Sequence, residues 1–423
     1  MPSEDHVSLR LAMLSVHTCP LAALGGKETG GMNVYVRELS RELGRMGVEV
    51  DVYTRSQNPV IPRVVALGER AHVIHVAAGP ERPLSREGLA GHLDEFVEGI
   101  EDWRIARGDY DLIYAHYWLS GLAGLALRDR WTVPVLQMFH TLGRLKNSVA
   151  RSASEVEPLR RIEAESRLVG AVDRMVAANV VEREHLRRLY GADRARIAVV
   201  PCGVDTTLFR PGDKTDARRD LGLADHPVIL YVGRLEPIKG LDTLLDAVGQ
   251  LHATGLPVEL LVVGGDTDDA PAGREAQLRQ RIGALGLAAK VRFVGAQPQE
   301  ALRAYYVAAD VTVLPSFYES FGMVALEAMA CGSPVVGSRV GGLTTTVRDG
   351  VTGHLVPEGD VNALAQRLAD LINDPDAGER LGREGTRWAV QHRWPCVAEA
   401  ICREFVSLEP LAEVHLASAR CRE

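Results

Sequence analysis

Two glutamates, Glu319 and Glu327, enclose the segment Glu-Ser-Phe-Gly-Met-Val-Ala-Leu-Glu, which follows a short apolar run. The pattern predicts a strand, a turn and a helix, and such turns are where open α/β sheets bind ligands. Carboxylates eight residues apart lie about two helical turns from each other, so both could face one crevice. Amides at the start of the predicted helix favour a phosphate group. These amides belong to Phe321, Gly322 and Met323.

Two basic residues follow another apolar run, Val228 to Gly233. Arg234 comes directly after this run, and Lys239 lies in the same predicted loop. Lysine is rare in this chain and arginine is common, so a lysine beside a strand end indicates that lysine itself is needed at this position. A planar arginine fork and a compact lysine charge can hold a diphosphate together. With the segment 319–327, these cations predict a nucleotide-diphosphate site.

The chain of 423 residues is longer than one hydrophobic core usually supports, so two domains are expected. Its net charge of −8 is spread without a basic run, which disfavours a nucleic-acid surface. The first apolar run, Leu9 to Val16, is too short to span a membrane, and no stable membrane association is expected. Scattered cysteines without metal-ligand spacing predict reduced thiols, no metal site and a cytoplasmic protein. The oligomeric state stays open, a homodimer included.

Apolar runs alternate with amphipathic helical stretches along the chain, which predicts parallel sheets covered by helices. Turn-forming residues between 203 and 227 mark the boundary between two halves of similar size. The tail is helical and is interrupted at Trp394-Pro395. Strands are expected at 11–16, 50–54, 73–77, 112–115, 135–139, 175–178 and 197–200, and at 229–232, 260–263, 291–294, 311–314 and 335–336.

Three further segments place polar residues at predicted strand ends in the first half. A glycine-rich loop, Gly25 to Asn33, follows the first strand and opens a helix, but it lacks the G-x-G-x-x-G of dinucleotide-binding folds. His116-Tyr117-Trp118 and His140-Thr141 end two later strands, where ligands are expected. By contrast, Arg160 and Arg161 lie in a predicted helix, 156–169, that is rich in charges of both signs, so taken alone they are expected on a solvated face of this helix. Arg86, taken alone, is likewise expected to be a solvated surface residue.

Taken together, these motifs resemble the family 4 retaining glycosyltransferases of GT-B fold, over about Leu11 to Leu371. The N-terminal motifs resemble the mycothiol branch, which acts on D-inositol 3-phosphate, with bacterial sucrose-phosphate synthase as a near cousin. The resemblance implies an α/β fold of two facing Rossmann-like domains with a deep cleft between them. It implies an acceptor domain over 1–203, a linker over 204–226, a donor domain over 227–390 and a helical tail over 391–423 that crosses back.

The resemblance also implies a role for each motif. Arg234 and Lys239 would hold the donor diphosphate, Glu327 the ribose hydroxyls and Glu319 hydroxyls of the sugar, with His140 near the anomeric carbon. The sequence departs from the pattern of the mycothiol branch at Arg86, where that branch has a lysine. Backbone amides at Gly30, Gly31, Phe321, Gly322, Met323 and Val324 would line the donor, and Asn33, Arg86, Tyr117, Thr141 and Arg161, or Arg160 in its place, would bind the acceptor.

The implied reaction moves a glucosyl or N-acetylglucosaminyl group from a UDP-sugar to a small soluble phosphorylated acceptor with retention and without a metal or other cofactor. D-inositol 3-phosphate is the first expectation for the acceptor. Fructose 6-phosphate and an unphosphorylated small molecule are the alternatives. A nicotinamide or flavin oxidoreductase, a non-catalytic sugar-nucleotide sensor and a transferase with a lipid acceptor are the rival classes.

Overall fold

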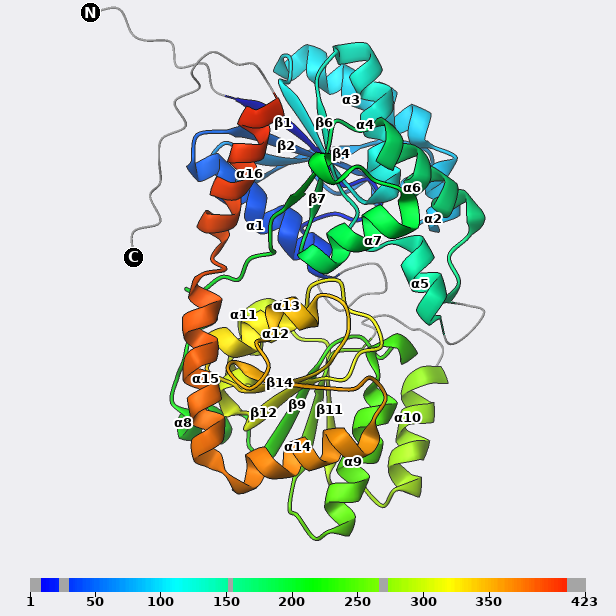
Figure 1. The fold of residues 1–423 in the computed structure, drawn as a ribbon. Coiled ribbons are helices and arrows are strands. Elements are labelled where there is room, and N and C mark those ends of the chain that lie inside the picture. Colours follow the sequence, from blue (N-terminus) through cyan, green and yellow to red (C-terminus); the bar gives the residue numbers. More distant parts are fainter. Residues whose placement is uncertain (1–8, 23–29, 151–154, 266–272, 409–423) are drawn as a thin grey trace, which may run out of the picture.

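The computed structural model describes residues 9–22, 30–150, 155–265 and 273–408, which form two α/β domains, one above the other in Figure 1. Each domain is built on one sheet with helices packed against it. The expected pair of parallel-sheet domains is confirmed. The glycine-rich residues 25–29 of the first predicted loop lie outside the described residues.

The N-terminal sheet has eight strands in the order β3-β4-β2-β1-β5-β6-β7-β8. All neighbours in this sheet run parallel except β3 and β4. In the centre, Leu11 pairs with Val50 on one side and Leu112 on the other. The strands are β1 (Arg10–Leu14), β2 (Glu49–Arg55), β3 (Val64–Gly68), β4 (Ala71–Val76), β5 (Leu112–His116), β6 (Val135–Met138), β7 (Arg174–Ala177) and β8 (Ile197–Val199).

Helices of the N-terminal domain pack on this sheet through apolar positions at helical spacing. In the first helix, Val36, Leu39 and Leu43 are fully buried, because residues three to four apart share one face. The helices are α1 (Gly31–Arg45), α2 (Arg86–Ala90), α3 (Leu93–Arg107), α4 (Tyr117–Trp131), α5 (Gly143–Val149), α6 (Leu159–Ala171), α7 (Val180–Tyr190) and the 3₁₀ turn η2 (Arg194–Arg196).

The C-terminal sheet has six parallel strands in the order β11-β10-β9-β12-β13-β14. They are β9 (Val228–Val232), β10 (Glu259–Val263), β11 (Val291–Gly295), β12 (Val311–Leu314), β13 (Val335–Ser338) and β14 (Gly353–Val356). The helices are α8 (Lys214–Asp220), the 3₁₀ turn η3 (Pro237–Lys239), α9 (Leu241–Ala253), α10 (Gly273–Ala284), α11 (Gln299–Ala308), α12 (Met323–Ala330), α13 (Leu343–Thr346), α14 (Val361–Asn373), α15 (Pro375–Val390) and α16 (Trp394–Leu408).

The two domains are joined at two crossings that lie side by side. Val204, after β8, forms a parallel bridge with Arg393, just before α16. A Cβ at Gly203 would collide with the Trp394 ring, so only glycine allows this approach. The helical tail is interrupted between α15 and α16, and α16 (red in Figure 1) packs along α1 of the N-terminal domain.

Several local expectations need correction. The helix expected from residue 156 begins at Leu159, because Pro158 has extended backbone and caps it. The described cysteines Cys19, Cys202, Cys331 and Cys402 are free, but the expectation of a reduced thiol is wrong for Cys396, which is disulfide-bonded. Within the described ranges, no helix is both long and apolar enough to cross a bilayer.

The order of each sheet fixes where ligands can bind. In the N-terminal sheet the connections leave β1 in opposite directions, toward β2 and toward β5, and in the C-terminal sheet β9 is the corresponding strand, between β10 and β12. Crevices outside the carboxyl ends of strands at such switch points are the binding sites of open α/β sheets. The residues singled out from the sequence follow β1, β5, β6, β9 and β12, so both crevices receive them.

Candidate active site

Lys239 is positioned by a tight contact between two loops of the C-terminal domain. It ends η3, and Gly240 follows with a left-handed φ of 72°. A Cβ at Gly240 would collide with the Pro315 carbonyl, and Phe317 N donates to Ile238 O at 2.8 Å. The loops after β9 and β12 are thereby held together. Lys239 Nζ lies 2.7 Å from Glu319 Oε2, which brings these two predicted site residues into direct contact.

Arg234 comes directly after β9 in the same crevice. Its guanidinium forms an ion pair with Glu236 at 2.9 Å, and both side chains are partly exposed. Its carbonyl accepts a hydrogen bond from the Tyr231 hydroxyl at 2.6 Å, which fixes the backbone at the strand end. Arg234 and Lys239 therefore both follow β9 closely, and each is paired with a carboxylate, Glu236 and Glu319 respectively.

The N-terminus of α12 provides the backbone amides expected in the site. Gly322 has a left-handed φ of 89°, and Ala325 is the first amide of the turn to bond to a backbone carbonyl, Gly322 O at 2.9 Å. The amides of Met323 and Val324 precede it and point along the helix axis toward the crevice. We expected the two glutamates to lie two turns apart on one helix. This expectation is wrong, because Glu319 lies in the loop before Gly322 and only Glu327 lies on the helix.

A second glycine pair, Gly341 and Gly342, supports this loop and was missed in the sequence. Gly342 N donates to Glu319 O at 2.8 Å. A Cβ at Gly341 would collide with the same carbonyl, and one at Gly342 would collide with Ser320 O. The pair follows β13 after Arg339 and Val340, and its position after an apolar run was the signal that could have revealed it.

Glu327 is buried on α12 and already hydrogen-bonded within the chain. Its carboxylate accepts from Tyr306 Oη at 2.7 Å and from Gln299 Nε2 at 3.2 Å. Gln299 in turn accepts a hydrogen bond from Arg37 of α1, so the network crosses to the N-terminal domain. Burial raises the pKa of Glu327 to about 7, although the hydrogen bonds from Tyr306 and Gln299 oppose this.

Glu327→Gln is expected to weaken binding of UDP-glucose and to remove its pH dependence. The wild-type carboxylate, with a pKa of about 7, becomes the better acceptor for ribose hydroxyls as pH rises, so affinity should increase between about pH 6 and 8. The folded pKa lies above the unfolded value, so the stability that Glu327 contributes is present below about pH 4.5 and is lost as pH rises through about 7. Calorimetric titrations of UDP-glucose into the wild type and Glu327→Gln, repeated across this pH range, measure the affinity of each protein. Equal pH slopes would exclude Glu327 from the donor site.

His140 and His116 form a pair at the carboxyl ends of β6 and β5, in which His116 is fully buried and His140 is partly buried. His116 Nδ1 lies 3.0 Å from His140 Nε2, so one ring donates to the other. His140 has a left-handed φ of 59°, a conformation that a non-glycine residue adopts only under constraint. Burial lowers the pKa of His140 to about 3, and burial together with His140 lowers the pKa of His116. Both imidazoles are therefore neutral, so each ring can donate one hydrogen bond and accept another, but neither is a general acid near neutral pH.

The four residues expected to bind an acceptor phosphate come together, and Arg161 is at their centre. Its side chain is only 1% exposed, so the solvated helix face favoured by the sequence is wrong for this residue. Arg161 donates to Thr141 O and Oγ1 at 2.8 and 2.9 Å and to Glu165 Oε1 at 2.7 Å. The guanidinium also lies over the Tyr117 ring, 4.8 Å from its centroid, and Arg86 lies over the same ring at 5.7 Å.

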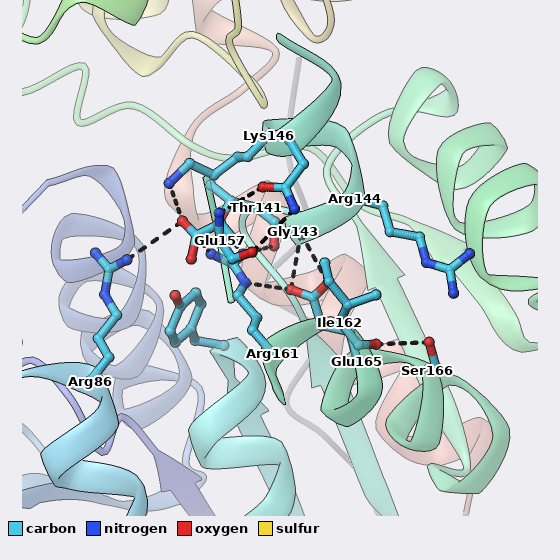
Figure 2. A network of polar contacts seen from close by, with 12 residues as sticks. Arg86, Thr141, Gly143, Arg144, Lys146, Glu157, Arg161, Ile162, Glu165 and Ser166 are labelled. Atoms are coloured by element: carbon cyan, nitrogen blue, oxygen red, sulfur yellow. Dashed lines mark hydrogen bonds and ion pairs between the residues drawn. The ribbon is translucent and has the colours of Figure 1, made fainter. Parts of the chain in front are cut away.

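Glu157 and Lys146 complete this acceptor cluster, and sequence reasoning missed both (Figure 2). Oε1 of Glu157 lies 2.9 Å from Arg161 Nη1 and 3.7 Å from Arg86 Nη1, and it also forms an ion pair with Lys146. Burial would raise the pKa of Glu157, but the charges of Arg161 and Lys146 outweigh it and lower the pKa. Glu157 is therefore an ionised carboxylate.

Two other predicted acceptor residues are placed differently. Arg160 is exposed, and its guanidinium reaches the Ala90 carbonyl at 3.4 Å, outside the acceptor cluster. The Asn33 side chain is buried and donates to Thr18 Oγ1 at 2.6 Å and Cys19 O at 2.8 Å, while its oxygen accepts from Gly30 N at 3.0 Å. In this structure Asn33 therefore holds the loop between β1 and α1.

The residues expected to bind the donor lie close to the N-terminal domain. A Cβ at Gly31, the first residue of α1, would lie 3.1 Å from Met323 Sδ at the start of α12. Asn179 Nδ2 donates to Ser320 O at 2.7 Å. A pocket beside Glu319 is lined by both domains, through Leu142, Leu145, Asn179, Val181, Glu182, His185, Tyr318, Glu319, Ser320, Gly341 and Gly342. In the described part of the chain, no group of three or more His, Cys, Asp or Glu side chains could hold a metal ion.

Sequence comparisons identify relatives of both domains. The profile of Glycosyltransferase Family 4 matches residues 29–208, and that of Glycosyl transferases group 1 matches residues 213–388. The chain is 42% identical over 398 residues to D-inositol 3-phosphate glycosyltransferase 2 of Catenulispora acidiphila, which covers 92% of this chain and 93% of the relative. The similarity therefore extends through both domains.

Solved structures support the same relationship. The sucrose-phosphate synthase of Thermosynechococcus elongatus has a TM-score of 0.87 and 36% identity, covering 95% of this chain and 99% of the synthase. Anabaena HepE in complex with UDP-glucose has a TM-score of 0.75, covering 95% of this chain and 100% of its own. Its identity of 21% indicates the shared fold alone. The expected fold of two facing Rossmann-like domains is confirmed.

Proposed function

The chain belongs to the family 4 retaining glycosyltransferases, and on this premise we propose that it transfers a hexosyl group from a UDP-sugar to a hydroxyl of a small phosphorylated acceptor. D-inositol 3-phosphate is the first candidate acceptor, because the relative that matches both domains carries that name. Glucose and N-acetylglucosamine are the candidate sugars. Such substrates suit the cytoplasmic location expected from the sequence.

The observation that supports a phosphorylated acceptor is the convergence of three cations near the ends of β5 and β6. Arg86, Lys146 and Arg161 all approach one carboxylate oxygen, with the Thr141 hydroxyl beside them. A phosphate group is bound by charged hydrogen bonds from the planar guanidinium of arginine and the compact ammonium group of lysine. An uncharged acceptor would have no use for three cations gathered in a partly buried pocket.

On the donor side, Arg234, Lys239 and the amides at the start of α12 would hold the diphosphate. Glu327 would accept the ribose hydroxyls, and Glu319 would bind hydroxyls of the sugar. Lys239 is paired with Glu319 in the structure, so binding of a diphosphate lets Lys239 turn to phosphate and leaves Glu319 for the sugar. Gly30 and Gly31 would add amides from the N-terminal domain. Domain 1–203 would thus bind the acceptor and domain 227–390 the donor, joined by 204–226 and the tail 391–423.

In the proposed reaction the bond between the anomeric carbon and the β-phosphate oxygen breaks, and its electron pair stays on phosphate. The fixed cations and amides stabilise this growing charge without reorganising. The acceptor oxygen forms the new bond on the same face, and its proton passes to a β-phosphate oxygen, so UDP leaves and the anomeric configuration is retained. His140, being neutral, would hydrogen-bond the sugar and take no proton.

A second acceptor, fructose 6-phosphate, is favoured by the similarity of the whole chain to a sucrose-phosphate synthase. The same cluster of cations would serve its phosphate. The oligomeric state stays open, a homodimer included. UDP is the expected nucleotide, and GDP- and ADP-sugars are the competing donors.

A panel of UDP-, GDP- and ADP-sugars against D-inositol 3-phosphate, fructose 6-phosphate, inositol and fructose tests the proposal. Mass spectrometry is expected to detect a hexosyl product with a UDP-sugar and a phosphorylated acceptor. Product from the unphosphorylated acceptors alone would contradict the phosphate pocket and would assign the chain to another acceptor class of the same family.

A further inference from the structure

Glu157 supplies the negative charge at the centre of the acceptor cluster. One atom, Oε1, faces Arg161, Arg86 and Lys146, which come from α6, α2 and α5 (Figure 2). The side chain is 7% exposed, so this charge is shielded from water. Cations from three elements that approach one oxygen are the surroundings expected for an oxygen of a bound phosphate. In the empty protein, a carboxylate of the chain itself has this place.

We propose that Glu157 is a specificity-determining residue whose carboxylate substitutes for the acceptor's phosphate in the empty enzyme and leaves the cluster when that phosphate binds. The inference rests on the proposed function for the identity of the acceptor. It adds a step to that function, because the acceptor must replace an anion that is already bound. The affinity of the pocket is then set by this competition as well as by the contacts made.

The backbone around Glu157 is suited to such an exchange. Asn147 Oδ1 accepts from Glu157 N at 2.6 Å, and Asn147 Nδ2 donates to Glu157 O at 3.1 Å. The main chain is thus held at both of its polar groups, and Asn147 lies on the same short helix as Lys146. The exchange would therefore move the Glu157 side chain and leave its main chain in place.

The charges of the cluster agree with this exchange. Within the described residues, Arg161 contacts the carboxylates of Glu157 and Glu165, and Arg86 and Lys146 contact Glu157. Withdrawal of Glu157 removes one negative charge from around the three cations, which favours the binding of a phosphate anion. Glu165 stays in place, because it is fully buried and also accepts hydrogen bonds from Gly143 N and Tyr190 Oη.

The exchange discriminates against small anions. Inorganic phosphate offers only its charge, so the tethered carboxylate competes with it effectively. A phosphorylated polyol offers further hydroxyl contacts that compensate for displacing Glu157. The carboxylate therefore keeps the three cations paired and unavailable to inorganic phosphate until the acceptor arrives.

The test is a calorimetric titration of inorganic phosphate into the full chain saturated with UDP, which blocks the donor phosphate site. Glu157→Gln is expected to bind phosphate about tenfold more tightly than wild type, because the competing charge is gone. Glu163→Gln makes the same change at an exposed position of α6 and should match wild type. Unchanged or weaker binding of phosphate by Glu157→Gln would overturn the proposal and would make Glu157 a structural partner of Arg161.

A second variant, Glu157→Asp, tests the proposal if Glu157→Gln does not fold. Glu157→Asp keeps the charge but shortens its reach, and its phosphate affinity should fall between those of wild type and Glu157→Gln. The KM for the phosphorylated acceptor should decrease in Glu157→Gln while the KM for the UDP-sugar stays unchanged. If no variant transfers sugar to a phosphorylated acceptor, the proposed function fails, while the phosphate titration still decides the role of Glu157.

Discussion

Lys239→Ala is expected to lower turnover at least ~100-fold, the scale found when one preorganised donor to a transition-state charge is removed. The lysine ends the turn η3 beside Glu319, where it would meet the charge that grows on the leaving phosphate. Loss of this partly exposed ion pair should cost only about 1 kcal/mol of folding free energy or less. Steady-state kinetics and thermal unfolding of the same preparation separate the two effects.

Lys290→Ala provides the matched control for this experiment. Lys290 precedes β11, at the amino-terminal edge of the same sheet and therefore away from the crevice. This variant should retain wild-type turnover. Turnover of Lys239→Ala within a few-fold of wild type would remove Lys239 from the catalytic residues.

Arg161→Ala is expected to destabilise the protein by about 3–5 kcal/mol, because it leaves the fully buried Glu165 without its cation and removes one of the cations around Glu157. Glu165 is fully buried and Glu157 nearly so, and both are paired with this guanidinium. Chemical denaturation measures the loss. Arg160→Ala, one residue away on the exposed face, should cost little by comparison.

Arg161→Lys keeps the charge and separates the acceptor role from folding. A lysine cannot contact Thr141, Glu157 and Glu165 together, since it lacks the guanidinium fork. Loss of one charged hydrogen bond to the acceptor phosphate should raise the KM for that acceptor about tenfold to hundredfold, with the donor KM unchanged. If Arg160→Ala raised the acceptor KM and Arg161→Lys did not, the phosphate contact would belong to Arg160.

Most strands could be predicted because their apolar runs are continuous, as buried parallel strands require. Two could not. The edge strand β3 is half exposed and pairs antiparallel with β4, so its sequence has no buried run. The strand β14 consists of Gly-His-Leu-Val, in which glycine and histidine mask a short apolar pair. In both cases the pairing partner, which the sequence does not reveal, decides the structure.

The contact between the two segments expected to bind the donor could be predicted, because they follow β9 and β12, which are neighbours in one parallel sheet. The acceptor cluster is harder, because Arg86 at the start of α2 and Glu157 just before α6 are far apart in sequence and meet only in the folded chain. Charged residues around 155–165 resemble a solvated helix when the fold is unknown. The available signal was the spacing of Glu157, Arg161 and Glu165, which places two carboxylates one helical turn on either side of one arginine.

The most direct test of the central claim is the ratio of kcat/KM for D-inositol 3-phosphate to kcat/KM for inositol, measured with the same UDP-sugar on the wild-type protein. Three cations directed at a phosphate should make this ratio at least ~100, equivalent to two or more charged hydrogen bonds. Fructose 6-phosphate against fructose provides the same comparison for the second acceptor. Ratios near one for both pairs would contradict the phosphate pocket formed by Arg86, Lys146 and Arg161.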